Sequence, residues 1–134
     1  MLLRGRFERE ETAVCADESF KHVWETYVRS WKAETPEDRQ ALLQSSLDPE
    51  CIYQDPLTRV EGLDALSAYM SEFHRQVPGG HFVTRYFMAY DARSIARWEM
   101  QGADGSVLGD GISYAEYGVD GKLARMTAFF QRPA

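Results

Sequence analysis

The spacing of apolar residues predicts three helices in the first part of the chain. Between about residues 19 and 34, apolar side chains recur every three or four positions, as they do on one face of a helix. The stretch Thr35–Asp38 offers a capping residue, a proline and two acids, which is typical of a second helix that ends before Asp48. A third helix follows Gly62 and is broken by Pro78-Gly79-Gly80.

Short runs with alternating or β-branched residues predict five strands. The first is brief, covers residues 51–55 and is stopped by Pro56. Asp-Gly pairs, which favour hairpin turns, stand between the second and third and between the third and fourth of the later strands. The later strands cover residues 81–90, 94–101, 107–117 and 123–131. The order α-α-β-α-β-β-β-β predicts an α+β domain, with helices packed on one face of a curved antiparallel sheet.

Length and charge restrict the class of protein. The 134 residues suit one domain, which we place at residues 17–134 behind a polar lead-in at residues 1–16. A net charge of −6 argues against nucleic-acid binding. Cys15 and Cys51 are interpreted as reduced thiols, and no apolar run reaches the roughly 18 residues that a membrane span needs. With no signal-peptide pattern either, we expect a soluble, cytoplasmic protein.

Motifs for cofactors are missing from the sequence. No Cys/His set has zinc spacing, and no glycine-rich stretch has the pattern that cradles phosphates. We therefore expect neither a metal nor a cofactor. Aromatic residues are plentiful, with seven Phe, seven Tyr and three Trp, which is more than a core of this size needs. This surplus indicates a lined cavity, an interface, or both.

Three short motifs resemble a known superfamily. They are Tyr53-Gln54-Asp55-Pro56, Gly62 opening a helix with Leu66 and Tyr69, and Gly121-Lys122-Leu123 before a final aromatic strand. With the order of elements, they resemble the NTF2-like superfamily, and within it the SnoaL-like polyketide cyclase and ketosteroid isomerase branch. The resemblance implies a cystatin-like cone, in which a bent sheet wraps around helices and leaves an apolar pocket. It also implies a dimer through the outer sheet face, while activities vary from isomerases to pure binding modules.

Asp55 and Tyr27 are the candidate catalytic residues. The strand period of two places Asp55 and Tyr53 on one face, so Asp55 would be a carboxylate among aromatic rings if that face lines the cone. The resemblance to ketosteroid isomerase implies that Asp55 is the general base and that Tyr27 donates its hydroxyl to the substrate oxygen. The alternatives are that Asp55 caps a turn and that Tyr27 is a core residue.

The third catalytic group of the isomerase pattern is absent. The resemblance calls for a protonated acid on the long strand, at a place that falls on Ser113, and a serine hydroxyl donates only one hydrogen bond. We therefore do not expect isomerisation of 3-oxo-steroids. Asp110, flanked by glycines, and His81, next to a glycine turn, are reserve candidates. On a regular strand Asp110 would face away from Ser113, and His81 would be solvated.

Alternation along the strands separates an inner face from an outer face. Small residues such as Ser113 are expected inside, where they leave room for a ligand. Ile95, Ile112, Tyr114 and Phe129 are expected outside, where they favour a homodimer. The expected pocket lining is Tyr53, Trp31, Met70, Phe73, Phe82, Trp98, Met100, Ser113, Met126 and Phe130. A filled cone is the alternative, because methionine often fills gaps.

These observations lead to two functional hypotheses. The first is a small-molecule enzyme that catalyses cofactor-independent proton transfer, of isomerase or cyclase type, on a small apolar carbonyl compound. The second is a non-catalytic ligand-binding or dimeric accessory module. In both, the expected partners are a small apolar molecule and a second copy of the chain, with no nucleic acid and no membrane.

Overall fold

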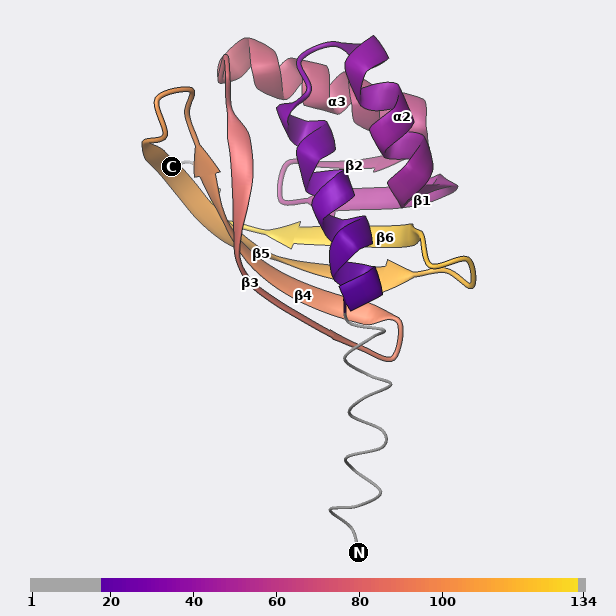
Figure 1. The fold of residues 1–134 in the computed structure, drawn as a ribbon. Coiled ribbons are helices and arrows are strands. Elements are labelled where there is room, and N and C mark those ends of the chain that lie inside the picture. Colours follow the sequence, from indigo (N-terminus) through magenta and orange to yellow (C-terminus); the bar gives the residue numbers. More distant parts are fainter. Residues whose placement is uncertain (1–17, 133–134) are drawn as a thin grey trace, which may run out of the picture.

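A layer of helices packs against the concave side of a bent sheet (Figure 1). The computed structural model describes residues 18–132, so the expected lead-in at residues 1–16, with Cys15, lies outside the described residues. The first helix spans residues 18–32. The other elements are α2 (Pro36–Ser46), β1 (Leu47–Asp55), β2 (Thr58–Glu61), α3 (Leu63–Gln76), β3 (His81–Tyr90), β4 (Arg93–Gln101), β5 (Val107–Tyr117) and β6 (Leu123–Phe129).

The sheet has the strand order β2-β1-β6-β5-β4-β3. The predicted α+β cone is confirmed, with two differences. The final strand β6 lies between β1 and β5 and runs parallel to β1, so the sheet is mixed rather than wholly antiparallel. In addition, β2 folds back on β1 after the Pro56 turn. A run of four residues is too short to show a strand pattern in the sequence.

Helix boundaries follow the local signals in the sequence. The Thr35 hydroxyl accepts a hydrogen bond from the Asp38 backbone N–H at 3.2 Å, and Pro36 opens α2. Gly62 precedes α3 with a φ of 85°, a conformation that glycine adopts without the steric cost of a Cβ. Strand β1 starts four residues earlier than predicted and contains Pro49. The pairing with β6 shifts register between Leu47 and Ile52, so Pro49 interrupts no regular ladder.

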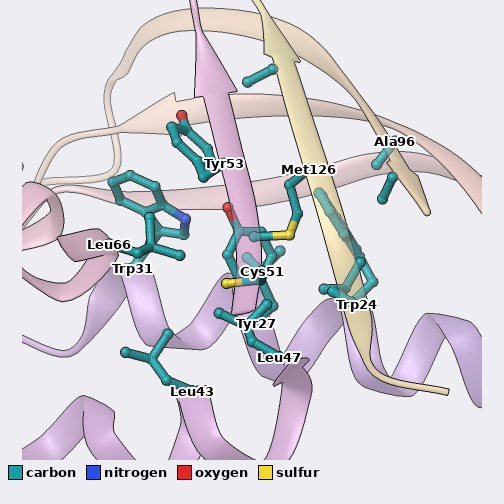
Figure 2. Packing of buried hydrophobic residues seen from close by; sticks show 14 of the residues in the cluster. Trp24, Tyr27, Trp31, Leu43, Leu47, Cys51, Tyr53, Leu66, Ala96 and Met126 are labelled. Carbon is teal, nitrogen blue, oxygen red and sulfur yellow. The ribbon is translucent and has the colours of Figure 1, made fainter. Parts of the chain in front are cut away.

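The core fills the end of the cone where β1 and β6 begin. Figure 2 shows part of this packing, with Leu43, Leu47, Cys51 and Met126 gathered around β1 and β6. Arg39 connects the helices that cover this core. Its side chain is completely buried. Its guanidinium donates to the carbonyl oxygen of Ala33 and to the carbonyl and hydroxyl oxygens of Ser67, all of them neutral groups. Satisfying these donors is what makes the burial of a cation tolerable.

Candidate functional site

A cavity of about 690 Å³ opens at the other end of the cone, between the helices and the sheet. Its wall is formed by side chains from the first helix, α3 and every strand except β2. Nine aromatic residues line it: Trp24, Tyr27, Trp31, Tyr53, Tyr69, Phe73, Phe82, Trp98 and Phe130. Trp31 is central to this wall, because its ring contacts those of Tyr53, Tyr69, Phe73 and Phe82. A volume of this size suits a small organic ligand.

The Asp55 carboxylate lies in the wall of this cavity and accepts four hydrogen bonds. Its Oδ2 accepts from the hydroxyls of Tyr53 and Tyr69, each at 2.7 Å. Its Oδ1 accepts from the backbone N–H groups of Leu57 at 2.7 Å and Thr58 at 3.0 Å. The residue is only 8% exposed. Since an ionised carboxylate has about four acceptor sites, all of them are in use.

Local sequence explains this arrangement. Strand β1 ends at Asp55, and Pro56 has no N–H, so the Asp55 side chain turns back to cap the two amides that follow. The strand period brings the Tyr53 hydroxyl to the same side. Tyr69 arrives from α3, on the helix face that also carries Phe73. Tyr69 was not among the residues expected in the site, although its helical spacing from Leu66 and Phe73 indicated that it faces the sheet.

Three neutral phenols lie in the cavity wall together with Asp55. Burial raises the pKa of Tyr27 well above its usual range, the Trp31 side chain opposes this as a hydrogen-bond donor, and Asp55 adds to the rise. Burial likewise raises the pKa of Tyr53, with further contributions from Tyr27 and Asp55. For Tyr69, burial and the hydrogen bond to Asp55 both raise the pKa. All three phenols are therefore protonated at neutral pH and available as donors.

Ser113 lines the cavity from β5. Its hydroxyl oxygen accepts a hydrogen bond from Trp98 Nε1 at 3.0 Å, which leaves the Ser113 proton free to point elsewhere. The Trp98 ring lies across Gly111, where a Cβ would come within 2.4 Å of the indole. Glycine at this position therefore allows the indole to cross the strand and reach Ser113.

Most of the residues named from the sequence meet in the cavity wall. Ten of them do so: Tyr27, Trp31, Tyr53, Asp55, Phe73, Phe82, Trp98, Met100, Ser113 and Phe130. Asp110 borders the cavity, while the strand register pairs it with Glu99 on the outer face.

Three residues lie away from the wall. Met70 and Met126 are 0% and 1% exposed and belong to the packed core, so the expectation that they line the cavity is wrong. Both methionines are on the face that the sequence predicts, but they lie deeper in the cone than the cavity wall. His81 is also outside the wall, where its Nδ1 is 3.2 Å from the Gly79 carbonyl oxygen.

Two features are absent from the described part of the chain. Residues 18–132 contain no group of three or more His, Cys, Asp or Glu side chains placed to hold a metal ion. Within the same range, no helix is long and apolar enough to cross a membrane.

Residues 24–126 match the family model of the SnoaL-like domain. The chain belongs to the SnoaL-like family. A comparison with curated proteins gives no match. The family assignment of this SnoaL-like protein therefore rests on the model match over most of the chain, together with the order of strands and helices that the structure shows.

Solved structures similar to this SnoaL-like protein share its fold at low sequence identity. A candidate isomerase of the SnoaL-like family from Agrobacterium tumefaciens is 21% identical, with a TM-score of 0.79 over 86% of this chain and 99% of that one. A candidate polyketide cyclase from Sinorhizobium meliloti is 14% identical, with a TM-score of 0.65 over 80% and 93%. A de novo designed protein with a curved β-sheet is 18% identical, with a TM-score of 0.66 over 85% and 86%. These likenesses show the fold alone.

Proposed function

We propose that this SnoaL-like protein is a small-molecule enzyme that catalyses cofactor-independent proton transfer, of isomerase or cyclase type, on a small apolar carbonyl compound. The observation that carries the proposal is the Asp55 carboxylate, held by two tyrosine hydroxyls in the wall of an aromatic cavity. Family membership agrees with such chemistry, and two structural neighbours are described as a candidate isomerase and a candidate cyclase.

In the proposed reaction Asp55 takes a proton from the carbon next to the carbonyl group. The electron pair of that C–H bond forms a carbon–carbon double bond, and the π pair of the carbonyl group moves to its oxygen. The Tyr27 hydroxyl donates a hydrogen bond to the enolate oxygen that results. The protonated Asp55 then returns the proton, either to the same carbon or to another position of the conjugated system. Ser113 offers a second, weaker donor to the same oxygen.

One of the four hydrogen bonds to Asp55 has to give way for this reaction. The two donors to Oδ1 are backbone amides within a turn, and Tyr53 is buried between Trp31 and Tyr69. Of the two tyrosines that donate to the carboxylate, Tyr69 is the more exposed. A substrate therefore either displaces the Tyr69 hydroxyl or transfers its proton through it, with the phenol passing its own proton to Oδ2.

The first test replaces the carboxylate with its amide. Candidate substrates are apolar cyclic β,γ-unsaturated ketones, assayed by isomerisation and by exchange of their α protons in D₂O with NMR detection. We expect Asp55→Asn to lower the rate about 100–10,000-fold, the range typical for loss of a general base. The matched control Asp110→Asn, on the cavity rim, should retain the rate. Turnover that survives in Asp55→Asn would contradict the assignment of the base.

The second test separates direct transfer from transfer through Tyr69. If the substrate displaces the Tyr69 hydroxyl, Tyr69→Phe frees an acceptor site on Asp55 and the rate stays equal or rises. If the proton passes through Tyr69, the same variant loses activity to nearly the extent of Asp55→Asn. Tyr53→Phe serves as the control, because it removes a hydrogen bond of the same length from the same oxygen.

The second candidate function is a non-catalytic ligand-binding or accessory module. It is favoured by Oδ1 of Asp55, which caps the turn after β1 and gives the residue a structural reason to be present. The similarity to a designed protein shows that this architecture exists without an evolved activity. In this case Asp55→Asn lowers the melting temperature, while the wild-type protein shows no proton exchange with any ketone of the panel.

We also propose that a second copy of the chain covers the outer face of the sheet. Large apolar side chains are exposed there on neighbouring strands, in the cross-strand pairs Met88–Ile95 and Ile112–Phe129. Apolar surface of this extent is typical of an interface. Light scattering should give a dimer at micromolar concentration for the wild type and a monomer for Ile112→Glu. A monomeric wild type would contradict this.

A further inference from the structure

Among the described residues of the cavity wall, the charged ones are all acidic. Among the described residues that line it are Asp55, Glu72 and Asp110, but no Lys, Arg or His. Glu72 is about half exposed and forms an ion pair with Arg75. Asp110 is exposed at the rim. Asp55 is therefore the one charged group set well inside the wall, and its four hydrogen-bond donors are all neutral.

An anion in this position favours a ligand of opposite charge. A carboxylate surrounded by aromatic rings has little water to stabilise it, so a cation brought into the same cavity gains a strong electrostatic interaction. The faces of tryptophan and tyrosine rings attract ammonium groups in addition. Trp24, Trp31 and Trp98 all contribute to the wall. A ligand carrying a carboxylate or phosphate meets repulsion from Asp55 and finds no cationic side chain in the described wall.

The proposed reaction gives a second reason for a cationic ligand. Proton transfer to Asp55 moves one negative charge from the protein to the ligand oxygen. Only Tyr27 and the weaker donor Ser113 are assigned to that oxygen, and removing a donor of this kind typically costs about 100–1000-fold in rate. With a protonated amine on the ligand, the summed charge of Asp55 and the ligand is zero both before and after the transfer. The ligand itself would then supply the positive charge that the wall lacks.

We propose that the substrate is an apolar amino-carbonyl compound, with a protonated amine that lies against the aromatic faces of the cavity. The carbonyl part of this inference rests on the proposed function. The amine part has its own basis in the charges and rings of the cavity, so a binding experiment that needs no turnover tests it.

The experiment compares three probes with one apolar body and three charges. 1-Aminoadamantane is cationic at neutral pH, 1-adamantanol is neutral, and adamantane-1-carboxylate is anionic. Binding is followed by tryptophan fluorescence, since all three tryptophans of the chain line the cavity, and by calorimetry. We expect the amine to bind about tenfold more tightly than the alcohol, a difference of about 1.4 kcal/mol, and the carboxylate to bind most weakly.

The Asp55→Asn variant tests the source of the preference. There the amine should lose its advantage over the alcohol, while Asp120→Asn, which neutralises an exposed acid in the turn between β5 and β6, should keep it. The proposal is overturned if the alcohol binds as tightly as the amine, if the carboxylate binds better than the alcohol, if the preference survives in Asp55→Asn, or if the amine fails to bind at millimolar concentration. In case Asp55→Asn does not fold, raised salt with the wild-type protein gives the second readout: salt should weaken binding of the amine and leave binding of the alcohol unchanged.

The failures of the two proposals are distinguishable. A charge order of amine, alcohol and carboxylate without proton exchange on any ketone would overturn the enzyme and retain a binding site for amines. Asp55-dependent exchange on neutral ketones without this charge order would retain the enzyme and overturn the amine.

Discussion

The two ends of the cone are built by the same strands and yet one is filled and the other hollow. On β5, Ala115 and Tyr117 are buried in the filled end, whereas Gly109 and Ser113 border the cavity. On β6, Met126 belongs to the core and Ala128, two positions further on the same face, lines the cavity. Neighbouring residues on one face thus differ in environment because the sheet curves around the helices, leaving space at one end only.

The comparison shows that burial has two different meanings in this molecule. At the filled end a buried side chain touches other side chains on every side, so its volume matters. At the hollow end a side chain can be shielded from solvent and still border open space, so its chemistry matters more than its volume. Matched substitutions at the two ends should therefore differ in their effects on stability.

The largest difference is expected for the loss of a leucine side chain. Leu123, at the filled end, is completely buried, while Leu108 lines the cavity and is half exposed. Leu123→Ala should lower the free energy of unfolding by about 2–5 kcal/mol, and Leu108→Ala by well under about 1 kcal/mol. Urea denaturation of both variants measures this. Equal losses would show that the hollow end is as tightly packed as the filled one.

A second pair adds volume instead of removing it. Ala115→Leu pushes a larger side chain into the filled end and should cost about 1–3 kcal/mol, because close-packed cores resist extra methylenes. Ala128→Leu grows into the cavity, so its stability should stay close to that of the wild type while binding of 1-aminoadamantane is lost. Thermal unfolding and fluorescence titration give both readouts. A stable Ala128→Leu that still binds would mean that ligands sit elsewhere.

The third prediction concerns pH at the filled end. Burial, and next the nearby Asp48, raise the pKa of the Cys51 thiol to about 11. A raised folded-state pKa favours the neutral thiol. The contribution of this thiol to the free energy of unfolding is therefore intact below about pH 9 and is lost as the pH rises towards 11. The slope is at most about 1.4 kcal/mol per pH unit for one proton. Cys51→Val should flatten the curve of unfolding free energy over this range, and an unchanged curve would contradict it.

The smallest difference is expected for two serines. At the filled end, Ser94 shares a hydrogen bond of 2.9 Å with the buried Tyr117 hydroxyl. At the hollow end, Ser113 accepts a hydrogen bond from Trp98. Trp98 lines the cavity, so in a Ser113 variant its N–H can donate to water there instead. Ser94→Ala should cost about 1 kcal/mol and Ser113→Ala a few tenths. A reversed order in chemical denaturation would show that the cavity is dry around Trp98.

The sequence was informative about faces and much less informative about depth. Periodicity placed Tyr53 and Asp55 on the inner face, and alternation did the same for Ser113, because both signals report the direction of a side chain. How far along the cone a residue lies depends on sheet curvature, which is a property of the whole sheet. Met70 and Met126 were for this reason assigned to the cavity wall although they fill the core.

Hydrogen-bond partners were harder still to predict. From the sequence, Asp55 is either a base or a turn cap. In the structure, one carboxylate oxygen caps the turn and the other accepts hydrogen bonds from two phenols. Tyr69 reaches Asp55 across 14 positions from another element. No local pattern encodes such a contact, since it depends on how α3 packs against β1.

The position of β6 also determines how the chain can fold. Before β6 is in place, β1 with β2 and the meander β3–β4–β5 are two separate pieces of sheet, since β6 alone is paired with both. The pairing of β1 with β6 joins residues more than seventy positions apart, such as Tyr53 and Met126. Contacts of such long range slow folding. Assembly of the sheet therefore waits for its last strand in sequence, and with it the cavity forms late and as a whole.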